Sequence, residues 1–321
     1  MSERIVLGSG PVALAYALFA ARSGPVSLRC RPPATAPAVE SVPAPLLTLL
    51  LELGITPAEL DVDRLSTHRL VAWDDPVPAE RQSPSCAHLD RAALTRALWR
   101  RVQDSPDIQV FAGGGTARLV DASGRRAVTA RAHTRPSPAW VATCRTVARG
   151  DLDPTMRLAA GPAGYGYRLG SARWLTVGWV GPGPGPRDAA ELRRRLEDSG
   201  AGWLAEDVDL QEGIWSRRAA SLDIPHASRD PDVVAIGDAA LARDALASQG
   251  TSIGLSDARL AAGRATRHEL EGRRADGLGR HLRSLHGILV ACRYRDQPVW
   301  SAYERWVGRQ LEVPARPAGG A

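Results

Sequence analysis

Residues 5–13 read Ile-Val-Leu-Gly-Ser-Gly-Pro-Val-Ala, an apolar triplet that leads straight into two glycines and a proline. The triplet predicts a short buried strand. The alanine-rich run that follows to Arg22 predicts a helix, and Val26-Ser27-Leu28 predicts a second strand. The opening of the chain therefore predicts a βαβ unit of an α/β protein.

The small residues of this turn follow the spacing Gly8-x-Gly10-x-x-Ala13. In a dinucleotide-binding βαβ unit, the first glycine permits the turn and the second lets a pyrophosphate approach the backbone. The third small residue lets the helix lie close to the strand. Pro11 and Val12 open the predicted helix, whose N-terminal N–H groups attract phosphate. A plain tight turn has the same pattern, so support for a nucleotide must come from elsewhere in the chain.

The second predicted strand departs from the usual pattern. An acidic residue that binds the ribose commonly follows the glycines by about 20 residues. Here the corresponding region reads Arg29-Cys30-Arg31. The missing acid disfavours ordinary NAD binding, and we expect Arg31 to face a phosphate or the ribose to be held by other groups.

A second glycine-rich stretch lies far downstream, after the apolar run 233–236. It begins Gly237-Asp238-Ala239-Ala240, and residues 248–258 read Ser-Gln-Gly-Thr-Ser-Ile-Gly-Leu-Ser-Asp-Ala. Residues 237–258 resemble the GDAAH-x3-P-x2-GQG-x-N pattern of the p-hydroxybenzoate hydroxylase and flavin-dependent halogenase superfamily, in matching register. The resemblance implies an FAD site in which Asp238, after Gly237, bonds the ribityl chain.

The same resemblance implies that Gln249-Gly250-Thr251, followed by Ser252, lies at the pyrimidine edge of the flavin. A helix that starts there would stabilise the negative charge that develops at N1 and the C2 carbonyl when flavin is reduced. The chain departs from the family pattern at four positions, which are Leu241 for histidine, Ala245 for proline, Ser248 for glycine and Ser252 for asparagine. The missing proline leaves the detail of the substrate face open.

Two further elements match the superfamily's order. Residues 120–125, Val-Asp-Ala-Ser-Gly-Arg, resemble its DG element, which makes Asp121 a candidate. Arg91, at the start of a predicted helix, resembles the arginine that reaches the phosphate side of the cofactor. Each could be a turn or a solvated face when taken alone, but in this order both are expected in the FAD site.

The predicted fold is α/β, with a Rossmann-like FAD-binding domain of the GR2 type, an inserted antiparallel β-sheet substrate domain and C-terminal helices. The FAD-binding domain is expected to be discontinuous, over 1–135 and 230–275. Apolar residues alternate in much of 136–229, which predicts the inserted sheet. Residues 276–321 are expected to form the C-terminal helical segment. The expected helices of the last third are at about 253–271, 277–294 and 298–311.

The composition excludes several classes of protein. The 321 residues carry a formal net charge of +6, and all 41 basic residues other than histidine are arginine, dispersed among 35 acids. This dispersion disfavours a nucleic-acid partner. The apolar runs are shorter than the roughly 20 residues of a membrane span. With four isolated cysteines, no CxxC pair and no leader before the first strand, we expect a cytoplasmic protein without a bound metal.

Within the superfamily, two features favour hydroxylation over halogenation. Halogenases depend on a lysine that relays hypohalous acid, and this chain has no lysine. Their GWxWxIP signature is only echoed at 164–169, Gly-Tyr-Gly-Tyr-Arg-Leu. We predict a flavin-dependent monooxygenase that hydroxylates an electron-rich indole or phenol through a flavin C4a-hydroperoxide, with electrons from NAD(P)H or a partner flavin reductase. The alternative is a flavin-dependent reductase or dehydrogenase, or a flavin-bearing partner in a biosynthetic complex.

The substrate is expected to be an aromatic small molecule or a tryptophan within a peptide, because residues 247–250 and the second sheet are similar to those of flavoproteins that hydroxylate peptidyl tryptophan. Tyr165 and Tyr167 share one face of a predicted strand. With Trp174 or Trp179 they could form an aromatic substrate wall, but core packing is the favoured interpretation. The seven histidines show no metal-ligand spacing, and the sequence assigns no general base.

Overall fold

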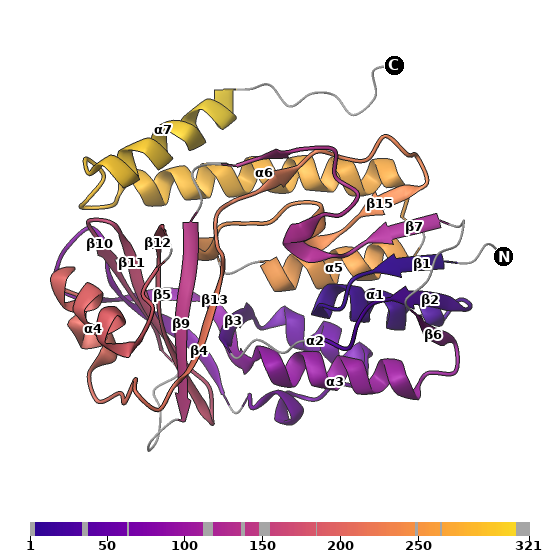
Figure 1. The fold of residues 1–321 in the computed structure, drawn as a ribbon, viewed down its shortest axis with the longest axis horizontal. Helices are drawn as coiled ribbons and strands as arrows, with labels where there is room; N and C mark the ends of the chain where they lie inside the picture. Colours follow the sequence, from indigo (N-terminus) through magenta and orange to yellow (C-terminus); the bar gives the residue numbers. More distant parts are fainter. Residues whose placement is uncertain are drawn as a thin grey trace.

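The computed structural model describes residues 4–33, 38–62, 64–111, 118–135, 139–147, 155–183, 185–247, 250–263 and 265–312. Two large sheets lie side by side, one at each end of the molecule (Figure 1). The helix α6 (Arg267–Val290) runs across the top of both sheets, and α7 (Pro298–Glu312) lies above the end that holds the eight-stranded sheet. A third, two-stranded sheet pairs β8 (His133–Thr134) with β14 (Ile224–Pro225).

The first sheet contains the predicted βαβ unit. Its strands are β1 (Arg4–Leu7), β2 (Val26–Arg29), β6 (Ile108–Phe111), β7 (Arg118–Asp121) and β15 (Val233–Ala235). They are all parallel, in the order β15-β7-β1-β2-β6. Because β15 comes from a distant part of the chain, this sheet is built from segments that lie far apart in the sequence.

Helices cover this sheet and share its apolar core. They are α1 (Pro11–Ala21), α2 (Pro45–Glu52), α3 (Arg91–Asp104) and α5 (Gly250–Ala262). The first of them, α1, is apolar on nearly every side and buries eight of its residues, because it lies between α3 and α5. A helix with no polar face is held in place by its neighbours, so its N-terminus is a rigid feature of the fold.

The second sheet has eight strands and a mixed pattern. Its strands are β3 (Val39–Pro43), β4 (Leu65–Ala72), β5 (Ala79–Asp90), β9 (Ala139–Val147), β10 (Met156–Gly161), β11 (Gly164–Gly170), β12 (Trp174–Pro182) and β13 (Ile214–Ala219). The order is β13-β9-β12-β11-β10-β4-β5-β3, and every pair is antiparallel except β10 with β4.

The second sheet contains strands from the first 135 residues, which the sequence did not predict. The expected boundary left all of residues 1–135 in the FAD-binding domain, whereas β3, β4 and β5 belong to the second sheet. The join is the parallel pairing of β10 with β4, in which Leu158 lies opposite Val71. Pairing between distant strands leaves no periodic signal in the sequence, and the first half of β5 is polar and exposed.

The two faces of the second sheet form separate cores because side chains alternate along each strand. On one face, Tyr165 and Tyr167 of β11 belong to a cluster with Leu285 of α6 (Arg267–Val290) and Trp300 of α7 (Pro298–Glu312). On the other face, Trp179 packs with α4 (Ala189–Asp198). The alternation thus separates Trp179 from the two tyrosines.

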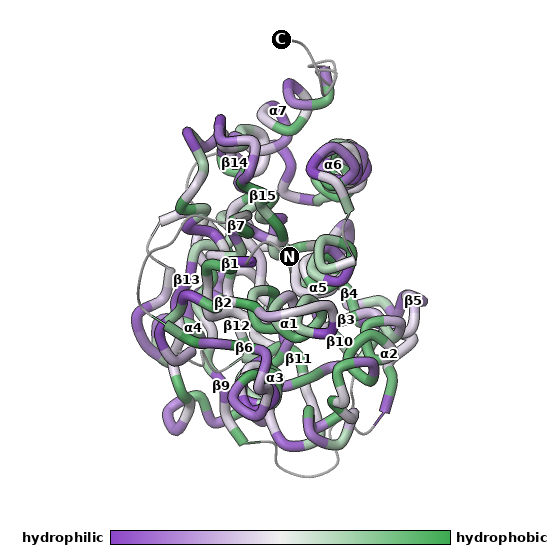
Figure 2. The backbone as a smooth tube through the Cα atoms, turned by 90° about the vertical axis from the view of Figure 1, so that its right-hand side faces the viewer, coloured by the Kyte–Doolittle hydropathy of each residue, from purple (hydrophilic) through white to green (hydrophobic). Residues whose placement is uncertain are grey.

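The C-terminal helices differ from the expected ranges. A break was expected near residue 272, but α5 ends at Ala262 and α6 runs unbroken from Arg267 to Val290. The start of α6 is set by a capping box at Thr266. The Thr266 hydroxyl accepts from the Glu269 N–H, and the Glu269 carboxylate accepts from the Thr266 N–H. The helix α6 is largely hydrophilic (Figure 2) and buries one stripe against the second sheet. None of the helices in the described ranges combines the length and apolar content that crossing a bilayer requires.

Candidate functional site

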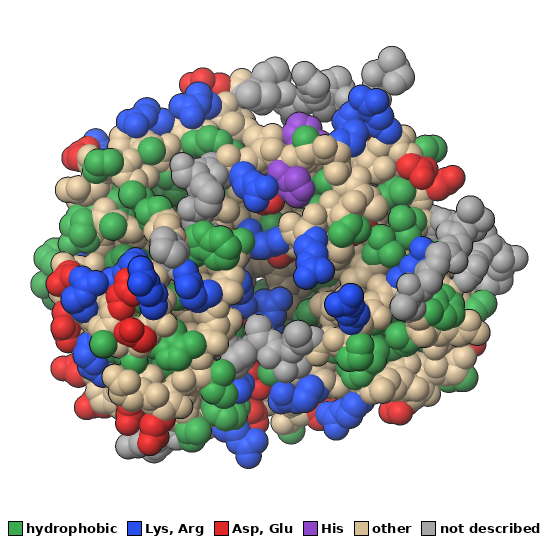
Figure 3. Space-filling view, in the orientation of Figure 1, with side chains coloured by type: hydrophobic (Ala, Val, Ile, Leu, Met, Phe, Trp, Pro, Cys, Tyr) green, Lys and Arg blue, Asp and Glu red, His purple; other side chains and the backbone are tan. Residues whose placement is uncertain are grey.

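A cavity of about 1070 Å³ lies where the two sheets meet. In the space-filling view it opens as a hollow at the centre of the molecule, with arginine side chains around it (Figure 3). Its size is slightly above the range typical of ligand pockets, about 300–1,000 Å³. Several loops at the carboxyl ends of the parallel strands line it, the usual place for ligands in an open α/β sheet.

The cavity gathers most of the residues that the sequence assigned to a cofactor or a substrate. Those in its lining are Gly8, Gly10, Pro11, Val12, Arg31, Arg91, Asp238, Gly250, Thr251, Tyr165 and Tyr167. The described candidates outside the lining are Ala13, Asp121, Gly237 and Ser252. Gln249 lies outside the described residues.

The turn after β1 forms one end of the cavity. Gly8 has φ +128°, and a Cβ there would lie 2.3 Å from the Ala122 carbonyl oxygen. Gly10 is the N-cap of α1 and provides no side-chain cap, so the first N–H groups of α1 lie at the cavity wall. Ala13 is fully buried beneath them, which lets the helix pack closely on the strand. This end has the geometry of an anion site.

The distant glycine-rich segment lies directly against this turn. A Cβ on Gly237 would be 3.1 Å from Val12 Cγ1, and one on Gly254 would be 2.5 Å from Val12 Cγ2. Gly237 itself has φ +59°, which re-aims the chain so that Asp238 enters the lining. The N-terminus of α5 follows closely, since a Cβ on Gly250 would be 3.4 Å from Asp238 Oδ1. The two segments that resemble flavin-binding motifs therefore form one continuous wall.

Asp121 has a structural task in this wall. Its carboxylate is fully buried and accepts hydrogen bonds from the Ser123 N–H (2.9 Å) and from the N–H (2.9 Å) and hydroxyl (2.7 Å) of Thr129. These bonds close the loop from 122 to 129, part of which lines the cavity. Asp121 thus shapes the site from behind.

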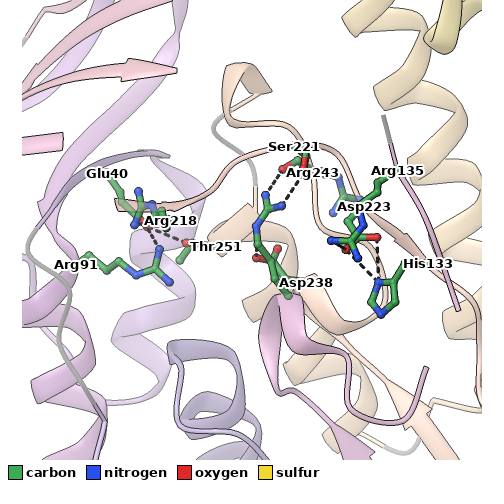
Figure 4. Close-up of polar contacts among 11 residues, drawn as sticks. Glu40, Arg91, His133, Arg135, Arg218, Ser221, Asp223, Asp238, Arg243 and Thr251 are labelled. Atoms are coloured by element: carbon green, nitrogen blue, oxygen red, sulfur yellow. Dashed lines mark hydrogen bonds and ion pairs between the residues drawn. The ribbon is translucent and has the colours of Figure 1, made fainter. Parts of the chain in front are cut away.

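Arg91 enters an ion network that the sequence did not indicate. Its Nη1 donates to Glu40 Oε1 at 2.5 Å, and Thr251 donates to Glu40 Oε2 at 2.8 Å (Figure 4). Arg218 Nη1 lies 3.8 Å from the same carboxylate. Burial by itself raises the pKa of Glu40, but the two guanidinium groups and the hydroxyl outweigh it and lower that pKa. The ionised Glu40 therefore ties α3, β13 and the start of α5 together across the cavity.

The other end of the cavity is apolar. Leu158, Leu169 and the rings of Tyr165 and Tyr167 lie there, on one face of the second sheet. Tyr167 fits over Gly178 of the next strand, where a Cβ would be 2.6 Å from its ring. Burial raises the pKa of Tyr167 to about 12 and that of Tyr165 well above its usual value, so both hydroxyls stay protonated.

Only one of the two candidate tryptophans shares the core of these tyrosines. Trp179 lies on the opposite face, whereas Trp174 packs against the same apolar cluster as the tyrosines, under the guanidinium of Arg145, whose Cζ is 4.0 Å from its ring centre. Neither lines the cavity. Instead Trp73 contacts Tyr165, with ring centres 6.0 Å apart, and Trp300 contacts Trp73 at 5.4 Å.

Asp244, which was not predicted from the sequence, contributes a buried carboxylate to the apolar end of the cavity. Its Oδ2 accepts from the Tyr303 hydroxyl at 2.6 Å, and its Oδ1 accepts from the Leu246 N–H at 2.8 Å. Burial raises the pKa of Asp244. The residue follows the Gly237–Asp238 motif by a few positions, but its contact with Tyr303 depends on the packing of α7 and leaves no local signal.

Arg125 clamps three segments around the cavity. Its guanidinium donates to the carbonyl oxygens of Ser221 (2.5 Å) and Arg243 (2.8 Å), and its Nε lies 3.8 Å from Asp238 Oδ2. Replacing it by methionine keeps the apolar stem but leaves both carbonyl groups without this donor. Because a buried unsatisfied acceptor costs about 1–3 kcal/mol, we expect Arg125→Met to lower the free energy of unfolding by about that amount.

Chemical denaturation measures this loss. The matched control is Arg126→Met, which removes the same charge from an exposed neighbour and is expected to change the free energy of unfolding by less than about 0.5 kcal/mol. Equal stability of the two variants would show that the clamp contributes nothing.

The similarity of this chain to known proteins lies in its fold. No protein-family model and no curated protein sequence matches this chain. Among solved structures, the peptidyl tryptophan dihydroxylase QhpG has a TM-score of 0.72 at 21% identity, over 94% of this chain and 78% of that one. A tryptophan halogenase from Shewanella frigidimarina has a TM-score of 0.74 at 12% identity, over 97% and 82%. The flavin-dependent halogenase CmlS has a TM-score of 0.69 at 14% identity, over 98% and 72%. The chain thus has the α/β fold of flavin-dependent halogenases and of a peptidyl tryptophan dihydroxylase, which confirms the fold predicted from its motifs.

Proposed function

We propose that this protein is an FAD-dependent monooxygenase that hydroxylates an electron-rich aromatic ring, an indole or a phenol. The observation that carries the proposal is the two-ended cavity, with an anion-binding turn at one end and an apolar, tyrosine-lined surface at the other. The similarity in fold to a peptidyl tryptophan dihydroxylase and to halogenases supports it. Tryptophan within a peptide is one candidate substrate, because the hydroxylase among these structures acts on a peptidyl tryptophan.

The residues present fit FAD. A Cβ on Gly10 would meet nothing within 4 Å, so open space lies where a pyrophosphate would approach the N-terminus of α1. Asp238 would accept hydrogen bonds from ribityl hydroxyls, and Arg31 would face a phosphate. The N-terminus of α5, held by the bond from Thr251 to Glu40, would lie at the flavin edge.

The chain's own contribution to the reaction is binding, orientation and exclusion of water. Reduced FAD, once bound, would activate dioxygen, with electrons from NAD(P)H or a partner flavin reductase. Leu158, Leu169 and the two tyrosine rings would hold the substrate ring in a dry surface next to the flavin. The partial positive charge at the start of α5 would stabilise negative charge on the reduced cofactor.

Oxygen labelling tests the proposal. FAD-loaded protein is supplied with NADPH or a flavin reductase under ¹⁸O₂, together with indole, phenol and a tryptophan-containing peptide in turn, with and without bromide. Mass spectrometry should find one or more products that carry ¹⁸O. Substrate that gains hydrogen instead of oxygen would favour the reductase alternative, and a brominated product would favour a halogenase; either result, without labelled product, would overturn the proposal.

Asp238→Ala should weaken FAD binding by about 10- to 100-fold, because a hydrogen bond to a charged group is worth about 1.5–3 kcal/mol. The fold should persist, since the Asp238 side chain is 34% exposed at the cavity wall. Quenching of FAD fluorescence on titration measures the dissociation constant. The control is Asp198→Ala on the surface of α4, where the side chain is 65% exposed; equal FAD affinity in the two variants would remove Asp238 from the site.

A further inference from the structure

We propose that the apolar end of the cavity is a subsite for an aromatic ring that carries a hydrogen-bond donor, with the Tyr165 hydroxyl and the Asp244 carboxylate accepting from the ring's N–H or O–H. This inference rests on the proposed function for the aromatic nature of the substrate. It adds which ring edge is recognised and by which residues.

The first observation is an unpaired hydroxyl. Tyr165 is 5% exposed, and its hydroxyl has no hydrogen-bond partner among the described residues. The neighbouring indole groups are satisfied, because Trp73 donates to the Ile288 carbonyl oxygen and Trp300 to that of Gly161, each at 2.8 Å. A buried polar atom without a partner is costly, and the Tyr165 side chain belongs to the cavity lining, so a ligand that reaches this buried hydroxyl would supply its missing hydrogen bond.

The second observation is spare acceptor capacity on Asp244. A carboxylate has about four acceptor positions, and here the partners are two neutral donors, the Tyr303 hydroxyl and the Leu246 N–H. Asp244 is only 5% exposed, yet it belongs to the cavity lining together with Tyr165. Its charge lies close enough to Tyr165 to raise the pKa of that hydroxyl further. The two acceptors thus serve the same small region.

The third observation is the rigidity of this region. The ring of Tyr165 packs edge-on against Trp73, which in turn packs edge-on against Trp300. The Asp244 carboxylate is fixed by Tyr303 of α7. Preorganised acceptors favour a ligand that brings a donor and penalise one that does not, because the second ligand leaves buried polar groups unpaired. A hydrogen bond from the ring N–H or O–H would also raise the electron density of the ring that is to be hydroxylated.

Binding of matched ligands to the oxidised protein, without any reductant, tests the inference. Indole and benzofuran have nearly the same shape, but only indole has an N–H donor. Calorimetric titration should show indole binding about tenfold or more tightly than benzofuran, as expected for one hydrogen bond to a charged acceptor. Equal affinities for the two ligands in the wild-type protein would overturn the inference directly.

Substitutions at Asp244 and Tyr165 test whether these two residues cause the preference for indole over benzofuran. Asp244→Asn and Tyr165→Phe keep the size of each side chain and should each reduce the ratio of indole to benzofuran affinity, and the double variant should bring it to within about twofold. Asp198→Asn on the exposed face of α4 is the matched control and should leave the ratio unchanged. Full selectivity in the double variant would overturn the assignment.

The outcome is separable from that of the oxygen-labelling experiment. Selective binding of indole without incorporation of labelled oxygen would support the subsite and count against the proposed function. Incorporation of labelled oxygen without selective binding of indole would support the proposed function and count against the subsite. The two proposals therefore fail independently.

Discussion

Gly10→Val is expected to weaken FAD binding by at least about 100-fold while the protein stays folded. The valine side chain would enter the open space at the start of α1 and displace a pyrophosphate, with loss of two or more hydrogen bonds to a charged group at about 1.5–3 kcal/mol each. The backbone tolerates the change, because Gly10 has φ −80° and ψ 170° and a Cβ there would meet nothing within 4 Å. The measurement is a titration with FAD followed by fluorescence.

The stability of the same variant is the internal control. Valine is a poor N-cap, so the free energy of unfolding of the FAD-free protein should fall by about 1 kcal/mol or less. Tight FAD binding by Gly10→Val would place the cofactor elsewhere. A large loss of stability would mean that the open space at the turn is needed by the fold itself.

Gly8→Ala is expected to have the opposite profile, with a large loss of stability of about 2–6 kcal/mol. Gly8 has φ +128°, a conformation that L-residues rarely adopt, and the added methyl would lie 2.3 Å from the Ala122 carbonyl oxygen. Strain of this kind costs about 1–3 kcal/mol, and overpacking costs a similar amount. The clash is with backbone, which can move only if β7 and its following loop shift.

Chemical denaturation of the FAD-free protein measures this effect. Gly10→Ala is the matched control, since it adds the same methyl group two residues later in open space and should change stability by less than about 1 kcal/mol. If the two alanine variants were equally stable, the turn after β1 would not be held as tightly as its contacts indicate. Together the substitutions at Gly8 and Gly10 separate the glycine that the fold requires from the glycine that the ligand requires.

The ion network of Glu40 explains why the two sheets keep a fixed relation around the cavity. Glu40 lies on a strand of the second sheet, and its carboxylate bonds Arg91 of α3 and Thr251 of α5, which belong to the first (Figure 4). The pKa of Glu40 is lowered, so the carboxylate stays ionised at neutral pH. The contacts that hold this arrangement therefore also set the width of the cavity where cofactor and substrate would meet.

The sequence by itself determined the βαβ opening, because the turn at Gly8 and the buried strand and helix beside it are specified by local chemistry. It also indicated that Gly237–Asp238 lies near that turn. This prediction came from the resemblance to a family motif, because contacts between distant segments cannot be predicted from a local sequence pattern. The general division into two sheets and C-terminal helices followed from a change of hydrophobic periodicity.

Only the tertiary structure decided which strands complete the second sheet and which charged groups enter the cavity. Strands β3 to β5 joined that sheet through the pairing of β10 with β4, and Glu40 of β3 lies near Arg218 of β13 although these strands are the two ends of the sheet order. Asp244 became a cavity acceptor through Tyr303 of α7, far along the chain. The physical reason is the same in each case. Hydrogen bonds and ion pairs between distant segments depend on how whole helices and strands pack, and the sequence around each residue has no periodic pattern that identifies its distant partner.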